Sequence, residues 1–209
     1  MKMFLRRSWV YSRVYAPIRD FYSWFKNGFT NNSPDLVKRR LLMRHAIHNA
    51  TFVETGTFLG NTTVFLASFS AKTYTIEPEE KLYEMARQRF ANSPKIDALK
   101  GTSEERFPEL LPLLSGDINF WLDGHYSGGI TFKGDSECPV ASELEQIEKN
   151  LVRFDKVSVL IDDVRCFPLS QSSALDKSDY PPLDTLVDWA RRNKFSWQIE
   201  HDIFIAKNH

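Results

Sequence analysis

The segment Thr51–Asn61, with the sequence TFVETGTFLGN, constrains the fold of this chain more than any other. It begins with a short β-branched and apolar run, passes through Gly56 and Gly60, and continues into a helical pattern from Thr62 to Phe69. A strand that turns through glycines into a helix brings backbone N–H groups and a helix N-terminus close to whatever lies beside the turn. The segment therefore predicts an α/β fold that binds a nucleotide-like ligand at this turn.

Strand-like and helical patterns alternate along the chain, as is typical of a mainly parallel sheet covered by helices on both faces. Two last strands, 195–200 and 202–206, lie so close that they must form an antiparallel hairpin, since a parallel pair needs a long crossover. We predict a Rossmann-like, doubly wound α/β fold whose mainly parallel seven-stranded sheet is closed by this C-terminal hairpin. The other predicted strands are 51–54, 73–77, 96–100, 118–123 and 157–162, and the predicted helices are 61–69, 79–91, 104–114, 139–150 and 181–193.

The first part of the chain differs from the rest. We predict an N-terminal helical appendage at 1–49 and the Rossmann-like domain at 50–209. Residues 1–30 carry six Lys or Arg, a single acid, Asp20, and nine aromatic residues. Such a basic, aromatic arm either packs on its own domain or on a twin subunit, which would make a homo-oligomer, or lies on an anionic membrane surface or another partner. Ser33 and Pro34 predict the start of the next helix, with Ser33 as its cap.

The overall charge limits the possible partners. The chain has 27 Lys and Arg against 27 Asp and Glu, which argues against a general nucleic-acid-binding protein. No apolar run is long enough to span a bilayer, and the basic N-terminus lacks the apolar core of a signal peptide. Cys138 and Cys166 form no CxxC motif, which favours unpaired thiols in a reducing compartment. We therefore expect a cytoplasmic protein, at the membrane surface if the arm docks there.

Acids, glycines and hydroxyl residues follow the five parallel strands in a characteristic order. The motifs are Glu54-x-Gly56-x-x-x-Gly60, Glu77 in TYTIEPE, Gly101-Thr102-Ser103, Asp123-Gly124-His125-Tyr126 and Asp162-Asp163. Over residues 50–206 this order resembles that of the class I S-adenosylmethionine-dependent methyltransferases. More narrowly, the segments LDGHYSGG and LIDDV resemble those of the metal-dependent sugar O-methyltransferases of the macrocin and mycinamicin type.

The resemblance implies a cofactor site at the carboxyl ends of the strands. The glycines would let the amino-acid part of S-adenosylmethionine approach the backbone, with Glu54 orienting the loop or meeting the ammonium group. Glu77 would accept hydrogen bonds from the ribose hydroxyls. Thr102 and Ser103 would lie near the adenine, although Ser103, before two glutamates, suits a helix cap equally well. The implied cofactor-binding residues are Glu54, Gly56, Thr57, Gly60, Glu77, Thr102, Ser103 and Asp123, with Thr57 and Phe58 making the loop bulkier than in many relatives.

Three aspartates end the fourth and fifth strands. If these strands are neighbours, about 4.8 Å apart, the carboxylates of Asp123, Asp162 and Asp163 converge and raise each other's pKa unless a cation neutralises them. Carboxylate oxygens suit Mg²⁺, which would also make an acceptor hydroxyl easier to deprotonate. The alternative is that one aspartate caps a loop and another binds Arg165 or Lys133.

A histidine follows the fourth strand. With an ordinary pKa of about 6.5, His125 suits the role of general base, for which Asp123 competes. The leading hypothesis is an O-methyltransferase that acts on a hydroxyl of a sugar or another small molecule. A glycine loop followed by Glu77 would also suit an NAD-dependent oxidoreductase, although the loop is not GxGxxG. The third hypothesis is a noncatalytic interaction module with the same fold.

Overall fold

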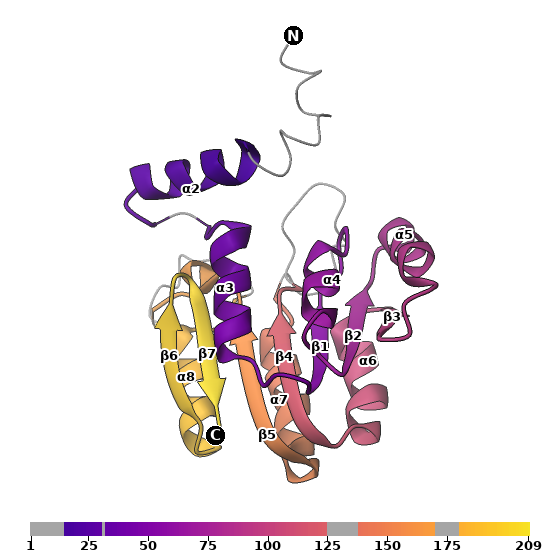
Figure 1. Cartoon of the computed structure of the whole chain (residues 1–209). Helices are drawn as coiled ribbons and strands as arrows, with labels where there is room; N and C mark the ends of the chain where they lie inside the picture. Colours follow the sequence, from indigo (N-terminus) through magenta and orange to yellow (C-terminus); the bar gives the residue numbers. More distant parts are fainter. Residues whose placement is uncertain (1–14, 31, 125–137, 170–179) are drawn as a thin grey trace.

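The computed structural model describes residues 15–30, 32–124, 138–169 and 180–209. At its centre lies a seven-stranded sheet with the order β3-β2-β1-β4-β5-β7-β6 (Figure 1). β7 is antiparallel to both of its neighbours, and the other pairs are parallel. This confirms the predicted Rossmann-like fold with its C-terminal hairpin. The strands are β1 Thr51–Thr55, β2 Lys72–Glu77, β3 Ile96–Lys100, β4 Gly116–Leu122, β5 Phe154–Ile161, β6 Ser196–Glu200 and β7 Ile203–Lys207.

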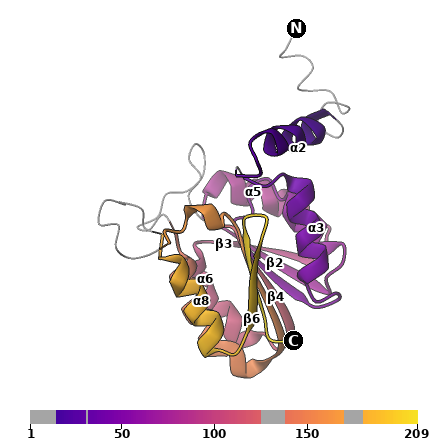
Figure 2. The same cartoon turned by 90° about the vertical axis from the view of Figure 1, so that its left-hand side faces the viewer.

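Helices cover both faces of the sheet, which Figure 2 shows close to edge-on. Side chains alternate along each strand, so Phe52 of β1 packs in the cluster with α3 and α4, whereas Val53 packs in the cluster with α6, α7 and α8. Both side chains are fully buried, and burial of an apolar side chain stabilises the fold by roughly 1.5–3 kcal/mol. The helices are α2 Ala16–Lys26, α3 Asp35–His45, α4 Asn61–Ala67, α5 Glu80–Phe90, α6 Ser103–Leu110, α7 Val140–Asn150 and α8 Leu183–Arg192.

The start of α3 differs from the prediction. The helix begins at Asp35 after Pro34, and no side chain caps it. The Ser33 hydroxyl instead donates a hydrogen bond to the carbonyl oxygen of His201 at 2.5 Å. Ser33 therefore fastens the segment before α3 to the turn between β6 and β7, and its predicted capping role was wrong.

Of the N-terminal appendage, the structure describes residues 15–30 and 32–49, which hold α2 and α3. The helix α2 lies outside the layers of the sheet (Figure 1). Trp24 anchors it, because its ring packs edge-on 5.3 Å from the ring of His201. The following helix, α3, packs Leu41 and Leu42 against the sheet. Among the described residues, no helix is long and apolar enough to cross a membrane. The division of the chain at residue 49 stays a prediction.

Candidate functional site

The strand register places the predicted motifs along one edge of the sheet. Thr55, the last residue of β1, lies opposite Ile76 of β2 and Leu122 of β4, and Leu122 lies opposite Ile161 of β5. The residues that follow these strands therefore lie side by side at the carboxyl edge (Figure 1). Along this edge the order is Gly101, Glu77, Gly56, Asp123 and Asp162. In doubly wound sheets, ligands bind at this edge where the strand order reverses, here between β1 and β4.

The glycine turn after β1 depends on two glycines. Gly56 has a φ of 86° and Gly60 a φ of 72°, which residues with a side chain rarely adopt. A Cβ atom at Gly56 would lie 2.4 Å from the carbonyl oxygen of Asp123, and one at Gly60 would lie 2.5 Å from the ring of Phe90. Gly56 thus lets the turn after β1 lie directly against the end of β4, and Gly60 lets α4 start against α5.

Glu54 is fully buried behind the glycine turn. Its Oε2 atom accepts hydrogen bonds from the hydroxyls of Thr63 on α4 and Thr75 on β2, at 2.5 and 2.7 Å. Its Oε1 atom is buried without a hydrogen-bond partner among the described residues. Burial raises the pKa of Glu54 to about 7, although the two threonine hydroxyls act to lower it. Of the two roles expected for Glu54, these contacts fit the one that orients the loop, and the Thr57 hydroxyl extends the network to Thr75 at 2.6 Å.

Glu77 joins two loops at the edge. Its Oε2 accepts a hydrogen bond from the backbone N–H of Phe58 at 2.7 Å, and its Oε1 accepts one from the N–H of Glu79 at 3.0 Å. The residue is only 4% exposed, and burial raises its pKa even though both backbone hydrogen bonds act to lower it. Because each carboxylate oxygen has two acceptor positions, Glu77 retains capacity for a further donor while it holds the glycine turn.

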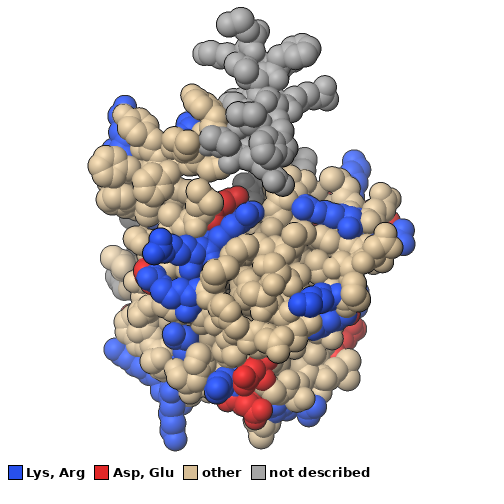
Figure 3. Space-filling model, in the orientation of Figure 1, with Lys and Arg blue, Asp and Glu red and all other residues tan. Residues whose placement is uncertain are grey.

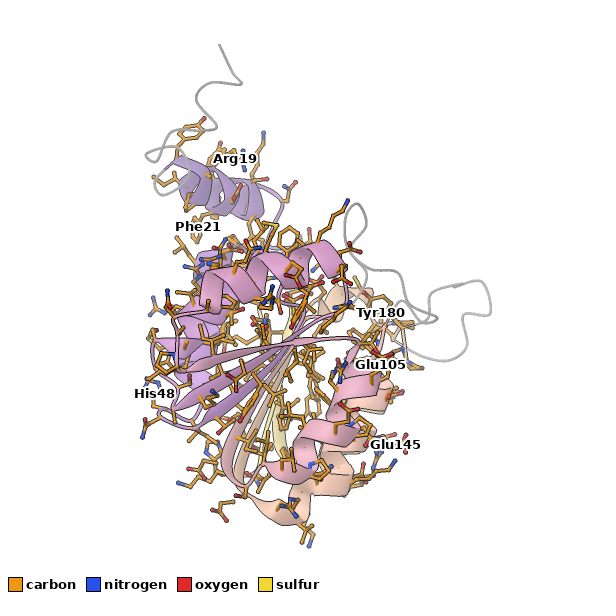
Figure 4. The ribbon with its side chains drawn as sticks, turned by 90° about the vertical axis from the view of Figure 1, so that its right-hand side faces the viewer. Arg19, Phe21, His48, Glu105, Glu145 and Tyr180 are labelled. Carbon is orange, nitrogen blue, oxygen red and sulfur yellow. The ribbon has the colours of Figure 1, made fainter. Side chains whose placement is uncertain are left out.

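The turn after β3 begins a helix. The Thr102 hydroxyl accepts a hydrogen bond from the N–H of Glu105, and the Glu105 carboxylate accepts one from the N–H of Thr102, at 3.3 and 3.1 Å. This reciprocal pair is a capping box, and Glu105 is marked on α6 in Figure 4. The cap is therefore Thr102 and not Ser103, which is buried as the first residue of α6.

The acids at the ends of β4 and β5 surround a lysine that the sequence analysis did not identify. Lys38 extends from α3, and its Nζ contacts the Oδ2 of Asp162 and lies 3.9 Å from the Oδ1 of Asp163. The side chain of Asp162 is fully buried and that of Lys38 is 15% exposed. Burial alone would lower the pKa of Lys38, but the charges of Asp162, Asp123 and Asp163 outweigh it and raise this pKa. The three carboxylates thus converge electrostatically on one ammonium group.

A second cation lies on the same cluster. The Nη1 atom of Arg165 donates to the Oδ1 of Asp163 at 2.6 Å and also contacts Asp202 in the turn between β6 and β7. Asp163 has a φ of 57°, a left-handed conformation that aspartate tolerates better than most residues. The alternative expected from the sequence, that one of these acids binds Arg165, is therefore confirmed for Asp163, whereas Lys133 lies outside the described residues.

As arranged, the acids do not fit a divalent cation. A Mg²⁺ site needs carboxylate oxygens that are available to the ion, but ammonium and guanidinium groups already lie on Asp162 and Asp163. One oxygen, Oδ1 of Asp162, is buried without a hydrogen-bond partner in the described ranges. Within these ranges, no group of three His, Cys, Asp or Glu residues could hold a metal ion. The prediction that Asp123, Asp162 and Asp163 bind Mg²⁺ therefore finds no support here.

Of the two candidate bases, Asp123 and His125, the structure describes Asp123. Asp123 lies beside the glycine turn, where its backbone N–H donates to the carbonyl oxygen and the hydroxyl of Thr55, both at 3.3 Å. His125 lies outside the described residues. The sequence analysis missed Lys38, the cation that contacts Asp162. Three acids at one edge indicate that a cation is needed, but nothing in the pattern around Lys38 identifies a lysine on a preceding helix as its source.

Comparisons with known proteins identify the fold. No protein-family model and no curated protein matches the sequence. A proposed caffeoyl-CoA O-methyltransferase from Staphylococcus aureus is 14% identical, with 92% of each chain covered and a TM-score of 0.55. The 23S rRNA methyltransferase ErmE is 10% identical (84% of this chain and 68% of that chain covered, TM-score 0.51). A proposed methyltransferase from Pseudomonas syringae is 15% identical (83% and 96% covered, TM-score 0.50). The chain therefore has a fold found in methyltransferases.

Proposed function

We propose that this protein is an S-adenosylmethionine-dependent methyltransferase. The observation that carries the proposal is the carboxyl edge of the sheet, where the Gly56–Gly60 turn and Glu77 lie on one side of the reversal in strand order and Asp123 on the other. Such an edge suits a ligand with a ribose and an amino-acid end. S-adenosylmethionine, when bound, supplies an activated methyl group.

The chain's own groups suit the binding of this cofactor. Glu77 would accept hydrogen bonds from the ribose hydroxyls in addition to its two backbone donors. The loop Gly56–Gly60 would face the amino-acid end, with Glu54 and Thr57 fixing the loop from behind. Thr102 and Ser103 follow β3 on the far side of Glu77 and would border the adenine.

We infer that the acceptor is a hydroxyl group of a sugar or another small molecule. In the transfer, the acceptor oxygen bonds to the methyl carbon, the bond from carbon to sulfur breaks, and the hydroxyl proton passes to a base. Asp123 and His125 are the candidate bases. Magnesium is not required by the proposal, because the Lys38 ammonium already neutralises the acids that would hold the ion. The balance of 27 basic and 27 acidic residues also disfavours a nucleic-acid acceptor.

The other two hypotheses are weaker. Dinucleotide-binding folds have the strand order 3-2-1-4-5-6, whereas here the antiparallel β7 lies between β5 and β6. This order and the lack of a GxGxxG loop disfavour an NAD-dependent oxidoreductase. A noncatalytic module would not need a buried acid that joins two loops at the ligand-binding edge, as Glu77 does.

Thermal unfolding with added ligands tests the proposal. S-adenosylmethionine and S-adenosylhomocysteine should each raise the melting temperature, because a ligand that binds only the folded state stabilises it. NAD is the control and should have no effect. A rise with NAD alone would favour the oxidoreductase, and no rise with any of the three would favour the noncatalytic module.

A further inference from the structure

The helix α2 has two different faces. On one face Trp24 is only 4% exposed, and its ring packs against His201 and against Phe29 at 4.7 Å. These contacts fix the rotation of the helix about its axis. Arg19 and Phe21 project from different sides of α2 in Figure 4. The buried tryptophan thus directs the remaining aromatic side chains of the helix into solvent.

The outward face of α2 is apolar. Ile18, Phe21, Tyr22 and Phe25 are spaced three or four residues apart and so share one side of the helix. Their exposed fractions lie between 48% and 64%. An apolar stripe of the kind found on interfacial helices is therefore present. Soluble monomers rarely expose apolar groups in so continuous a patch, which usually marks an interaction surface.

Positive charge accompanies this face. Arg19 and Lys26 lie along one edge of the apolar stripe, and Arg19 also pairs with Asp20. Residues 1–30 hold six of the chain's 27 basic residues but only one of its 27 acids. Aromatic and aliphatic side chains flanked by cations are the features of a helix that lies in the plane of an anionic membrane surface.

We propose that α2 docks this protein on an anionic lipid surface. A second copy of the chain fits this face less well, because two facing α2 helices would bring like charges together. RNA also fits less well, since it requires available cations. Figure 3 shows a group of basic side chains over α3, but much of the charge on α3 is engaged. Lys38 contacts Asp162, Arg39 lies over the ring of Phe65, and Arg44 contacts Glu200.

The docking helix lies beside the carboxyl edge of the sheet. His201, which Trp24 contacts, is in the turn that also holds Asp202, and Asp202 contacts Arg165 in the acid cluster. A bound lipid surface would therefore lie next to the edge that we propose binds the cofactor and acceptor. The proposal for α2 does not depend on the proposed catalytic function.

Vesicle co-sedimentation of the full chain tests the proposal. The protein should pellet with mixed phosphatidylcholine–phosphatidylserine vesicles and at least tenfold less with phosphatidylcholine alone. The double variant Ile18→Ser, Phe25→Ser should lower binding to the mixed vesicles at least tenfold, because each side chain loses roughly 1.5 kcal/mol or more of apolar burial. The matched control is Leu113→Ser, Val152→Ser, which also removes two highly exposed apolar side chains, and it should bind as the wild type does.

Three results would overturn the proposal. One is equal loss of vesicle binding in the control variant, and another is wild-type binding by the α2 variant. The third is no vesicle binding together with a dimer, or an RNA complex, that the α2 variant disrupts. Because the substituted side chains are exposed, the thermal unfolding of both variants should match that of the wild type, which separates loss of binding from loss of folding.

Discussion

Two groups of carboxylates lie at the same edge of the sheet, and they have different kinds of partner. Beside the glycine turn, Glu54 and Glu77 accept hydrogen bonds from uncharged donors, the threonine hydroxyls and backbone N–H groups. At the ends of β4 and β5, Asp162 and Asp163 lie against the cations of Lys38 and Arg165. Burial raises the pKa of both Glu54 and Glu77, which have no cation beside them in the described ranges, whereas the charges of Asp162 and Asp163 are paired with cations within the protein.

This difference shows that an acid at the end of a strand does not by itself indicate a ligand-binding residue. Both groups look alike there, since each is an acid after an apolar strand at the carboxyl edge. The two groups differ in which part of the chain supplies the group that contacts each carboxylate. The partners of Glu77 come from its own loop and the adjacent turn, but the partner of Asp162 comes from a helix before the whole sheet.

Removal of Lys38 should have the largest effect. Lys38→Met would leave the buried carboxylate of Asp162 without its cation, and breaking a buried ion pair in this way costs about 3–5 kcal/mol. Urea unfolding should show this loss in the free energy of unfolding. The control Arg40→Met removes an exposed cation from the same helix and should change stability by less than about 0.5 kcal/mol.

The double variant Lys38→Met, Asp162→Asn sharpens this prediction. With the buried charge also removed, most of the lost stability should return. If the double variant is no more stable than Lys38→Met alone, the lysine stabilises the fold by packing rather than by charge.

Loss of Glu77 comes next. Glu77→Ala should weaken the binding of S-adenosylhomocysteine about a hundredfold, or about 2.7 kcal/mol, because it removes the proposed ribose acceptor and frees the glycine turn. Isothermal titration calorimetry measures this affinity. Glu109→Ala, an exposed glutamate on α6, is the control. An unchanged affinity in Glu77→Ala would remove the ribose role.

The pH dependence of stability tests the uncharged surroundings of Glu54. Its pKa in the folded protein is about 7, against 4.5 as the ordinary value. The stability present at low pH is therefore lost as the pH rises through 7. Between pH 5 and 8 the wild type should lose on the order of 2 kcal/mol more than Glu54→Gln, whose side chain does not ionise. Parallel curves for the two proteins would mean that folding does not raise the pKa of Glu54.

A smaller effect is expected at the cap of α6. Thr102→Ala removes one half of the capping box and should lower the free energy of unfolding by about 1 kcal/mol. Thr102→Ser keeps the hydroxyl and should retain most of this stability. The same two variants test the proposed contact near the adenine, because cofactor affinity would fall in Thr102→Ala beyond what a helix cap explains.

The smallest expected effect is that of Mg²⁺. Addition of the ion should leave the melting temperature of the wild type unchanged, because the Lys38 ammonium lies where the acids converge. A clear rise would mean that Asp162 and Asp163 exchange their cations for the metal, and the two acid groups would then differ less than proposed.

The sequence predicts the order of strands and helices well, because hydrophobic periodicity and turn residues are local features. The strand at Thr51, the glycine turn and the C-terminal hairpin all follow from neighbouring residues, and their alignment at one edge follows from the parallel topology. Thr102 rather than Ser103 as the cap is an error of one residue between two equally suitable side chains. Lys38 could not be predicted, because its place depends on how α3 packs across the finished sheet.

The contact between Lys38 and Asp162 joins positions 124 residues apart in the chain. During synthesis the lysine emerges long before its partner, so this ion pair forms only after β5 and the residues that follow it have been made. A shortened chain that starts at Thr51 would retain every strand and Arg165, yet the buried carboxylate of Asp162 would lose the Lys38 ammonium. The helix α3 is thus a component of that edge, because it supplies the cation of Asp162.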